Sequence, residues 1–189
     1  FSVDWNHVKD AINDQTRMVI VNTPHNPTGA IWSKADWQNL IELIRDKNII
    51  VLSDEVYEHL IYDGQQHYSA LSFPELRERN FVVGSFGKTF HVTGWKTGYC
   101  IAAPALMTVF RQIYQFANFC GVTPVQWALA NFMQDHPEHI QELSAFYQAK
   151  RDLFNSQISA SRFKFQPSQG TYFQNLDYSA IRPDLNDIE

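Results

Sequence analysis

Three short, continuous apolar runs, each followed within a few residues by polar side chains, constrain the fold of this chain most strongly. Strands that face solvent on one side alternate apolar and polar residues, whereas strands buried on both faces of a parallel sheet form unbroken apolar runs. Helical patterns or long loops separate the runs, as they do in α/β proteins. We therefore predict an α/β fold with a mostly parallel sheet. The runs are Met18 to Val21, Ile49 to Leu52 and Phe81 to Val83.

The polar residues that follow these runs define a candidate site. Asn22 and the loop to Asn26 follow the first run, Asp54 follows the second, and Ser85 to Lys88 follow the third. In open α/β sheets, ligands bind outside the edge where the carboxyl ends of the strands meet. We expect these residues to converge there.

Capping residues and apolar periodicity predict helices before and between the runs. Asp4 predicts a short helix through about Ile12. Ser33, with Asp36 three residues further on, is typical of a capping pair, and it begins a helix whose apolar residues recur at helical spacing. These residues are Trp37, Leu40, Ile41 and Ile44.

The second half of the chain changes from helices to an alternating pattern. A helix is predicted from Pro104 to about Phe119, and Pro124 suits the first turn of another. A longer helix runs from near Pro137 to Ile158. After it, Phe163 to Phe165 alternate in polarity and Thr171 to Leu176 predict a further strand. We place a domain boundary on or near the long helix.

Composition excludes several classes of partner. The formal charge of −5 gives no basic surface that would attract a nucleic acid or an anionic membrane. No apolar run approaches the roughly 20 residues of a membrane-spanning helix. We therefore expect small-molecule ligands and a soluble, cytoplasmic protein. Because the chain opens at Phe1 without an initiator methionine, we also expect a fragment.

The cysteines and histidines form no metal-ligand pattern. Cys100 and Cys120 lie in apolar segments, and we expect both to be buried free thiols. His136 and His139 lie three residues apart, but Pro137 stands between them and no third ligand is evident. No metal site is expected.

Lys88 lies in the turn Gly84-Ser85-Phe86-Gly87-Lys88-Thr89. One interpretation is a nucleotide phosphate loop, but that loop needs glycine five residues before the Gly-Lys pair, where Val82 stands. The other is a lysine that forms a Schiff base, which needs a carboxylate for a pyridine nitrogen, donors for a ring oxygen and a phosphate cup. Asp54, Tyr57, Asn26 and Lys88 each have an ordinary structural explanation. Only their joint order favours the second interpretation.

Three ordered motifs resemble the successive signatures of class I/II aminotransferases of fold type I, over roughly Phe1 to Leu176. The resemblance implies the three-layer α/β/α transferase fold, pyridoxal 5'-phosphate (PLP) as cofactor, and a homodimer. Residues 1–135 would belong to the large PLP-binding domain, and 136–189 would form the linking helix and the start of a small α+β C-terminal domain. The motifs are Asn26-Pro27-Thr28-Gly29, Ser53-Asp54-Glu55-Val56-Tyr57, and Ser85-Phe86-Gly87-Lys88-Thr89-Phe90 with Thr93-Gly94-Trp95-Lys96-Thr97-Gly98-Tyr99.

The resemblance implies roles position by position. Lys88 would hold PLP as a Schiff base and, once displaced by the amino substrate, would shuttle the proton at the substrate α-carbon. Asp54 would pair with the protonated pyridine nitrogen and keep the ring cationic. Tyr57 and Asn26 would hydrogen-bond the phenolic oxygen of the ring and stabilise its ionised form.

Ser85 and Lys96 would bind the phosphate. Lys96 departs from the commonest pattern, which has arginine in the Gly-Trp-x-x-Gly segment, and a lysine lacks the two-pronged fork. It is similar to the kynurenine and glutamine transaminase branch, and the overall pattern is most similar to the methionine aminotransferases of that branch. The family's upstream phosphate-binding turn and downstream carboxylate-binding arginine are not assigned here, so we expect the fragment alone to be inactive.

The segment before Pro124-Val125-Gln126 bears on the substrate. The aspartate-specific branch carries an arginine there for the second carboxylate, whereas this chain has Ala117-Asn118-Phe119. The resemblance therefore implies transfer from an apolar or aromatic L-amino acid, of the methionine, phenylalanine or kynurenine type, to a 2-oxo acid. A cysteine-conjugate β-lyase and a non-catalytic sensor domain stay as alternatives. The aromatic residues Tyr114, Phe116 and Phe119 could form a dimer interface, a substrate pocket or plain core.

Overall fold

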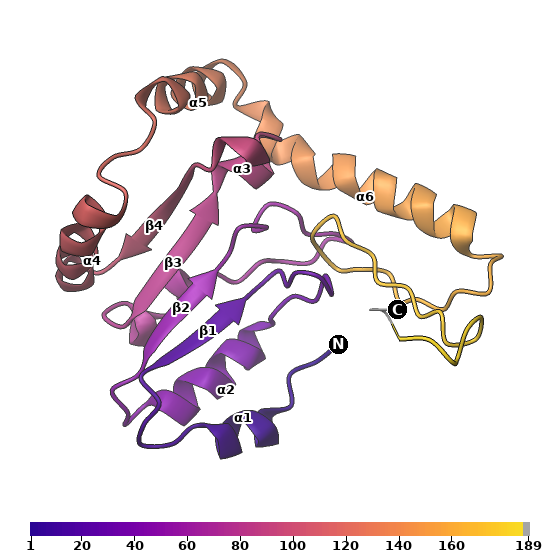
Figure 1. The fold of residues 1–189 in the computed structure, drawn as a ribbon, viewed down its shortest axis with the longest axis horizontal. Coiled ribbons are helices and arrows are strands. Elements are labelled where there is room, and N and C mark those ends of the chain that lie inside the picture. Colours follow the sequence, from indigo (N-terminus) through magenta and orange to yellow (C-terminus); the bar gives the residue numbers. More distant parts are fainter. Residues whose placement is uncertain (187–189) are drawn as a thin grey trace.

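A four-stranded, mostly parallel sheet forms the centre of the fold. The structure is a computed structural model that describes residues 1–186. The strand order is β1-β2-β3-β4; the first three strands are parallel, and β4 is antiparallel to β3 (Figure 1). The predicted α/β class and the three predicted strands are confirmed. The strands are β1 (Met18–Asn22), β2 (Ile50–Asp54), β3 (Asn80–Ser85) and β4 (Gly98–Ala102).

The register of the parallel strands brings their carboxyl ends to one edge. Asn22 is the partner of Asp54, and Asp54 is the partner of Val83, two residues before Ser85. The end of β1, the end of β2 and the turn that carries Lys88 therefore lie next to one another, as predicted for parallel strands.

Strand β4 was not predicted from the sequence. It returns from the turn after β3, so that Gly98 pairs with Ser85 and Ala102 pairs with Phe81. A side chain at Gly98 would lie 2.4 Å from the Gly84 carbonyl oxygen, so only glycine fits this close approach. The apolar run from Tyr99 to Ala103 is the sequence signal for this strand, and it was not among the three runs from which strands were predicted.

The expected helices before and between the first two strands are confirmed, with their caps. In α1 (Trp5–Ala11) the Asp4 carboxylate accepts from two backbone N–H groups, and α2 (Lys34–Ile44) begins with a complete capping box between Ser33 and Asp36. The four predicted apolar residues of α2 are buried, and they pack in one core cluster with the strands. Its strand members include Val21, Val51 and Val82.

The opposite face of the sheet is covered at β3 and open at β1. Phe81 points away from α2, because its neighbour Val82 packs in the α2 core, and its ring lies 6.2 Å from that of Phe110 in α4 (Pro104–Ala117). Sheet, α2 and α4 thus form three layers at this position. On β1, by contrast, Ile20 is 69% exposed.

The predicted long helix is α6 (Glu138–Ile158), which follows α5 (Thr123–Asp135). It begins beside the lysine turn, where the His139 ring nitrogen Nε2 lies 2.8 Å from the Thr89 carbonyl oxygen, and it extends toward the C-terminal segment (Figure 1). The domain boundary that we place on or near this helix stays a prediction.

The predicted strand over Thr171 to Leu176 is wrong. The segment after α6 makes only isolated bridges, between Ile61 and Gly170 and between Lys164 and Asp177. Thr171 has a φ of 64°, which interrupts an extended strand at its first residue. Short 3-10 turns (Ala70–Ser72, Pro74–Leu76 and Thr93–Trp95) and the one-turn helix α3 (Phe86–Thr89) complete the described elements.

Two expectations about burial are also corrected. Cys100 is a half-buried free thiol, but Cys120 is exposed, so the prediction of two buried thiols is wrong for Cys120. Phe116 and Phe119 are 89% and 77% exposed, which excludes a core role for them within the described chain. None of the helices among residues 1–186 is long and apolar enough to cross a membrane.

Candidate active site

The end of β2 is held in place by a buried carboxylate. Glu55 is 1% exposed; one of its oxygens accepts from Ser53 Oγ at 2.8 Å and from the Ala70 amide at 2.9 Å, and the other lies 2.8 Å from His67 Nε2. Glu55, His67 and Glu58 bring ligand atoms within 4.8 Å of one another. Because hydrogen bonds already occupy the Glu55 oxygens, we assign this group a structural role.

Asp54, the neighbour of Glu55, is a half-buried carboxylate at the edge of the sheet. Its Oδ1 accepts a 3.2 Å hydrogen bond from the Val56 amide. Burial raises the pKa of Asp54 above its usual range, while the nearby Lys88 ammonium acts in the opposite direction. A second cation beside Asp54, such as a protonated ring nitrogen, would therefore be favoured.

Lys88 extends from α3 over a set of tyrosine rings. Its Nζ donates to the Tyr172 hydroxyl at 3.2 Å and lies 5.6 Å from the centre of the Tyr57 ring. Tyr57 is 1% exposed and donates to the same hydroxyl at 3.4 Å. Burial, together with this hydrogen bond and the charge of Asp54, raises the pKa of Tyr57. Asp54, Tyr57 and Lys88 are thus brought together as predicted.

Tyr172 is the member of this cluster that sequence reasoning missed. It comes from the segment after α6 and lies 84 positions from Lys88 in the chain. Its neighbours in sequence predicted a strand, and a strand pattern does not reveal which other segment a given side chain will meet. No local signal in the sequence marked it.

The turn between β3 and β4 brings Ser85 and Lys96 to one end of the sheet. The Gly87 carbonyl oxygen accepts from the Val92 amide at 3.0 Å and from Thr93 Oγ1 at 3.2 Å, which closes the turn. A Cβ atom at Gly87 would lie 3.0 Å from Thr93 Cα and 3.3 Å from Ser85 Oγ. Lys96 adopts a left-handed conformation (φ 53°) two residues before Gly98, the partner of Ser85.

The side chains of the two remaining cofactor-binding candidates, Lys96 and Asn26, are exposed. Lys96 is exposed and makes no ion pair or hydrogen bond to any residue from 1 to 186. The backbone N–H of Asn26 donates to Asn22 Oδ1 at 2.7 Å, and the Asn22 side-chain amide in turn donates to the Asp54 backbone carbonyl oxygen at 3.1 Å. The loop is therefore tied to the site, but the side chain of Asn26 is exposed and bonds to none of the described residues.

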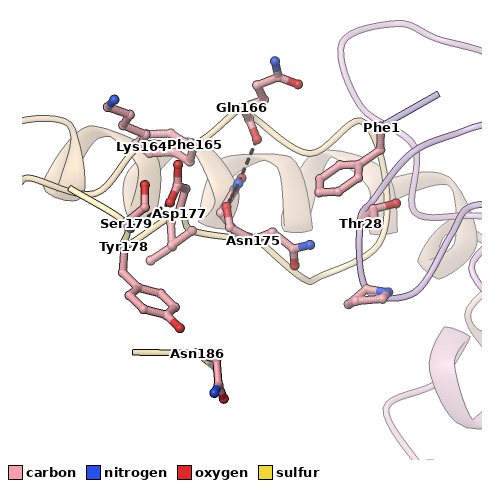
Figure 2. Close-up of a pocket in the computed structure, with 13 residues that line it drawn as sticks. Phe1, Thr28, Lys164, Phe165, Gln166, Asn175, Asp177, Tyr178, Ser179 and Asn186 are labelled. Atoms are coloured by element: carbon pink, nitrogen blue, oxygen red, sulfur yellow. Dashed lines mark hydrogen bonds between the residues drawn. The ribbon is translucent and has the colours of Figure 1, made fainter. Parts of the chain in front are cut away.

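One groove lies away from Lys88, which is not among the residues that line it. It measures about 1140 Å³ and separates the loop at Pro27 and Thr28 from the C-terminal segment (Figure 2). A smaller cavity of about 180 Å³ is lined by Tyr147, Arg151 and Tyr172, among others. Tyr172 therefore lies between Lys88 and a cavity.

Residues 1–184 match the family described as aminotransferase class I and II. The chain belongs to this family. Membership implies pyridoxal 5'-phosphate as the cofactor. The site fits that group: a half-buried carboxylate with an elevated pKa lies near Lys88, and a turn with little room for a side chain at Gly87 follows β3.

Several curated relatives are aminotransferases. The chain is 44% identical to a methionine aminotransferase of Escherichia coli over 100% of this chain and 49% of the relative. It is 38% identical to a kynurenine–oxoglutarate transaminase of Dictyostelium discoideum, over 90% of this chain and 40% of that protein. The chain thus spans about half the length of these relatives.

Solved structures of the family share the fold. The crystal structure of the E. coli methionine aminotransferase aligns with a TM-score of 0.94 at 44% identity, covering 99% of this chain and 49% of that one. An N-succinyldiaminopimelate aminotransferase from Mycobacterium tuberculosis aligns with a TM-score of 0.90 at 32% identity, covering 95% and 47%. These matches extend over the sheet, the lysine turn and α6.

Proposed function

We propose that this chain is the cofactor-holding part of an aminotransferase that moves an amino group from an apolar or aromatic L-amino acid to a 2-oxo acid. The observation that carries the proposal is the placement of Lys88 beside Asp54 and Tyr57 at the carboxyl edge of the sheet. The donors we propose are of the methionine, phenylalanine or kynurenine type. The relatives at 44% and 38% identity, a methionine aminotransferase and a kynurenine–oxoglutarate transaminase, support this class of donor.

PLP, when bound, supplies an electron sink that allows the bond between the α-carbon and hydrogen of an amino acid to break. We assign Lys88 the covalent hold on the cofactor and the transfer of the proton to and from the substrate α-carbon. We assign Asp54 to the ring nitrogen of the cofactor. Burial raises the pKa of Asp54 despite the nearby Lys88, so its carboxylate favours a further positive charge, which a proton on the ring nitrogen would supply.

The other predicted residues would complete the cofactor site. We assign Tyr57 and Asn26 to the ring oxygen; the Tyr57 hydroxyl keeps its proton and can donate it. Ser85 and Lys96 are assigned to the phosphate, since the β3–β4 turn carries both at the same end of the sheet. Lys96 would act there as a point charge rather than as a bidentate fork.

We further propose that the active protein is a homodimer and that residues outside this chain contribute to the substrate site. The exposed aromatic rings of Phe116 and Phe119 support an apolar interface. Because the chain has half the length of its relatives, we expect little turnover from it in isolation.

Transamination assays on the complete natural protein test this proposal. With a 2-oxo acid acceptor, methionine, phenylalanine and kynurenine are expected to react faster than aspartate. A cysteine conjugate supplied without an acceptor serves as the control for lyase chemistry. Preference for aspartate, or release of pyruvate and ammonia as the main reaction, would contradict the proposed function.

A further inference from the structure

The hydroxyl oxygen of Tyr172 contacts both Lys88 and Tyr57. Its hydroxyl accepts one hydrogen bond from Lys88 Nζ at 3.2 Å and another from Tyr57 at 3.4 Å. The Lys88 nitrogen also lies 5.9 Å from the centre of the Tyr172 ring. Among the described residues, this hydroxyl is the hydrogen-bond acceptor for the Lys88 amine.

The ring of Tyr172 is held by packing against three other aromatic rings. It meets Tyr57 edge to face at 5.3 Å, contacts Tyr147 at 5.7 Å and contacts Phe173 at 4.8 Å between ring centres. Edge-to-face and offset contacts of this kind stabilise a defined ring orientation. Although Tyr172 is 39% exposed, these ring contacts hold it where its hydroxyl oxygen meets Lys88.

The backbone before Tyr172 is fixed as tightly as its ring. The Thr171 amide donates to the Leu60 carbonyl oxygen at 3.0 Å, and the Tyr62 hydroxyl donates to the Thr171 carbonyl oxygen. A Cβ atom at Gly170 would lie 2.7 Å from the same Leu60 oxygen. Arg151, which is 8% exposed, donates to the Ser168 carbonyl oxygen at 2.8 Å.

We propose that Tyr172 is a positioning residue for Lys88, supplied to the cofactor site by the segment that follows α6. Its hydroxyl accepts a hydrogen bond from the amine and so holds the amine in one orientation at the carboxyl edge of the sheet. The role rests on the proposed function of Lys88. Under this proposal, the segment after α6 contributes a residue to the lysine site as well as to the lining of the smaller cavity.

The Tyr172→Phe variant removes the hydroxyl and keeps the ring. Reductive methylation of Lys88 in the cofactor-free, complete natural protein at one fixed pH, followed by peptide mass analysis, gives the rate at which the amine reacts. Because the hydrogen bond to Tyr172 restrains the amine, its loss is expected to raise this rate by about threefold to tenfold.

Tyr147→Phe is the matched control. Its hydroxyl contacts His91 Nδ1 at 3.1 Å, and its ring packs on Tyr172 without contacting Lys88. This variant is expected to leave the methylation rate of Lys88 at the wild-type value. An unchanged rate in Tyr172→Phe, or an equal increase in Tyr147→Phe, would overturn the positioning role.

Borohydride trapping of the cofactor on Lys88 separates this inference from the proposed function. Trapping together with an unchanged methylation rate in Tyr172→Phe would reject the positioning role alone. A raised rate in that variant without any trapping in the wild-type protein would reject the proposed cofactor function and leave the contact between Tyr172 and Lys88 established.

Discussion

The cofactor site has two regions that differ in how the protein holds them. The inner group, Asp54, Tyr57, Lys88 and Tyr172, is linked by hydrogen bonds, ring contacts and charge interactions. The outer group, Asn26 and Lys96, is exposed, and its side chains make no polar contact within residues 1–186. The fold preorganises the inner group before any cofactor binds, whereas the side chains of Asn26 and Lys96 would become ordered only when they bind it.

The largest expected effect follows from changing the inner carboxylate. Asp54→Asn removes the charge assigned to the ring nitrogen, so transamination by the complete protein is expected to fall by about 100-fold to 1000-fold. Steady-state kinetics measure the loss, and Asp10→Asn, which changes an exposed carboxylate on α1 outside the site, serves as the control. A rate within a few fold of wild type would remove Asp54 from the mechanism.

The same variant has the opposite effect on the stability of the cofactor-free protein. The folded state raises the pKa of Asp54, so ionisation of this carboxylate destabilises the folded protein. The stabilisation contributed by the protonated form is lost as pH rises through the folded pKa. Asp54→Asn is therefore expected to unfold at a higher temperature than wild type at neutral pH, with the difference disappearing in acid. Thermal unfolding across pH tests this, and a less stable variant at neutral pH would be inconsistent with it.

A smaller effect is expected from loosening the segment that carries Tyr172. Arg151 makes two 2.7 Å bonds to the Asp63 carboxylate as well as its bond to Ser168. Arg151→Met leaves these acceptors unpaired and is expected to cost about 1–3 kcal/mol of unfolding free energy. Denaturant unfolding measures the change, with Arg182→Met, an exposed arginine, as the control.

The pH dependence of this variant follows from the charge of Asp63. The hydrogen bond from Arg151 lowers the pKa of Asp63, so the stabilisation is present at neutral pH and is lost as pH falls through that lowered pKa. Wild type and Arg151→Met should therefore approach each other in stability in strong acid. A gap that widens on acidification would contradict the role of this ion pair.

The smallest effect on the fold is expected in the outer group. Lys96→Ala should change the unfolding free energy of the cofactor-free protein by less than about 0.5 kcal/mol, because Lys96 is exposed. The same change should weaken PLP binding by about tenfold, since one phosphate contact is lost. Lys96→Arg keeps the charge and should retain the affinity. Equal PLP affinity in all three proteins would exclude Lys96 from the phosphate site.

The difference between the two regions also separates what the sequence predicts from what it does not. The unbroken apolar runs identified β1, β2 and β3, and the polar residues after them identified Asp54 and Lys88, because strand burial and strand polarity are local properties. Tyr172 was missed because its approach to Lys88 depends on where the segment after α6 folds back, which is a property of the tertiary structure.

The two structural errors have related causes. The stretch at Thr171 has the composition of a strand, but its backbone is left-handed there. Its hydrogen bonds go to Leu60 and Tyr62 rather than to the successive residues of a neighbouring strand. β4 has a short apolar run of its own that was not assigned to a strand, and its pairing with β3 is favoured by the closed turn around Gly87 and the close approach at Gly98.

The most direct test of the central claim, that Lys88 carries the cofactor, is borohydride reduction of the complete natural protein after incubation with PLP, followed by peptide mass mapping. A pyridoxyl group on the peptide that contains Lys88, absent from a Lys88→Arg variant, is the predicted result. A reduced protein without an adduct on Lys88, or with the adduct on Lys96 instead, would contradict the claim.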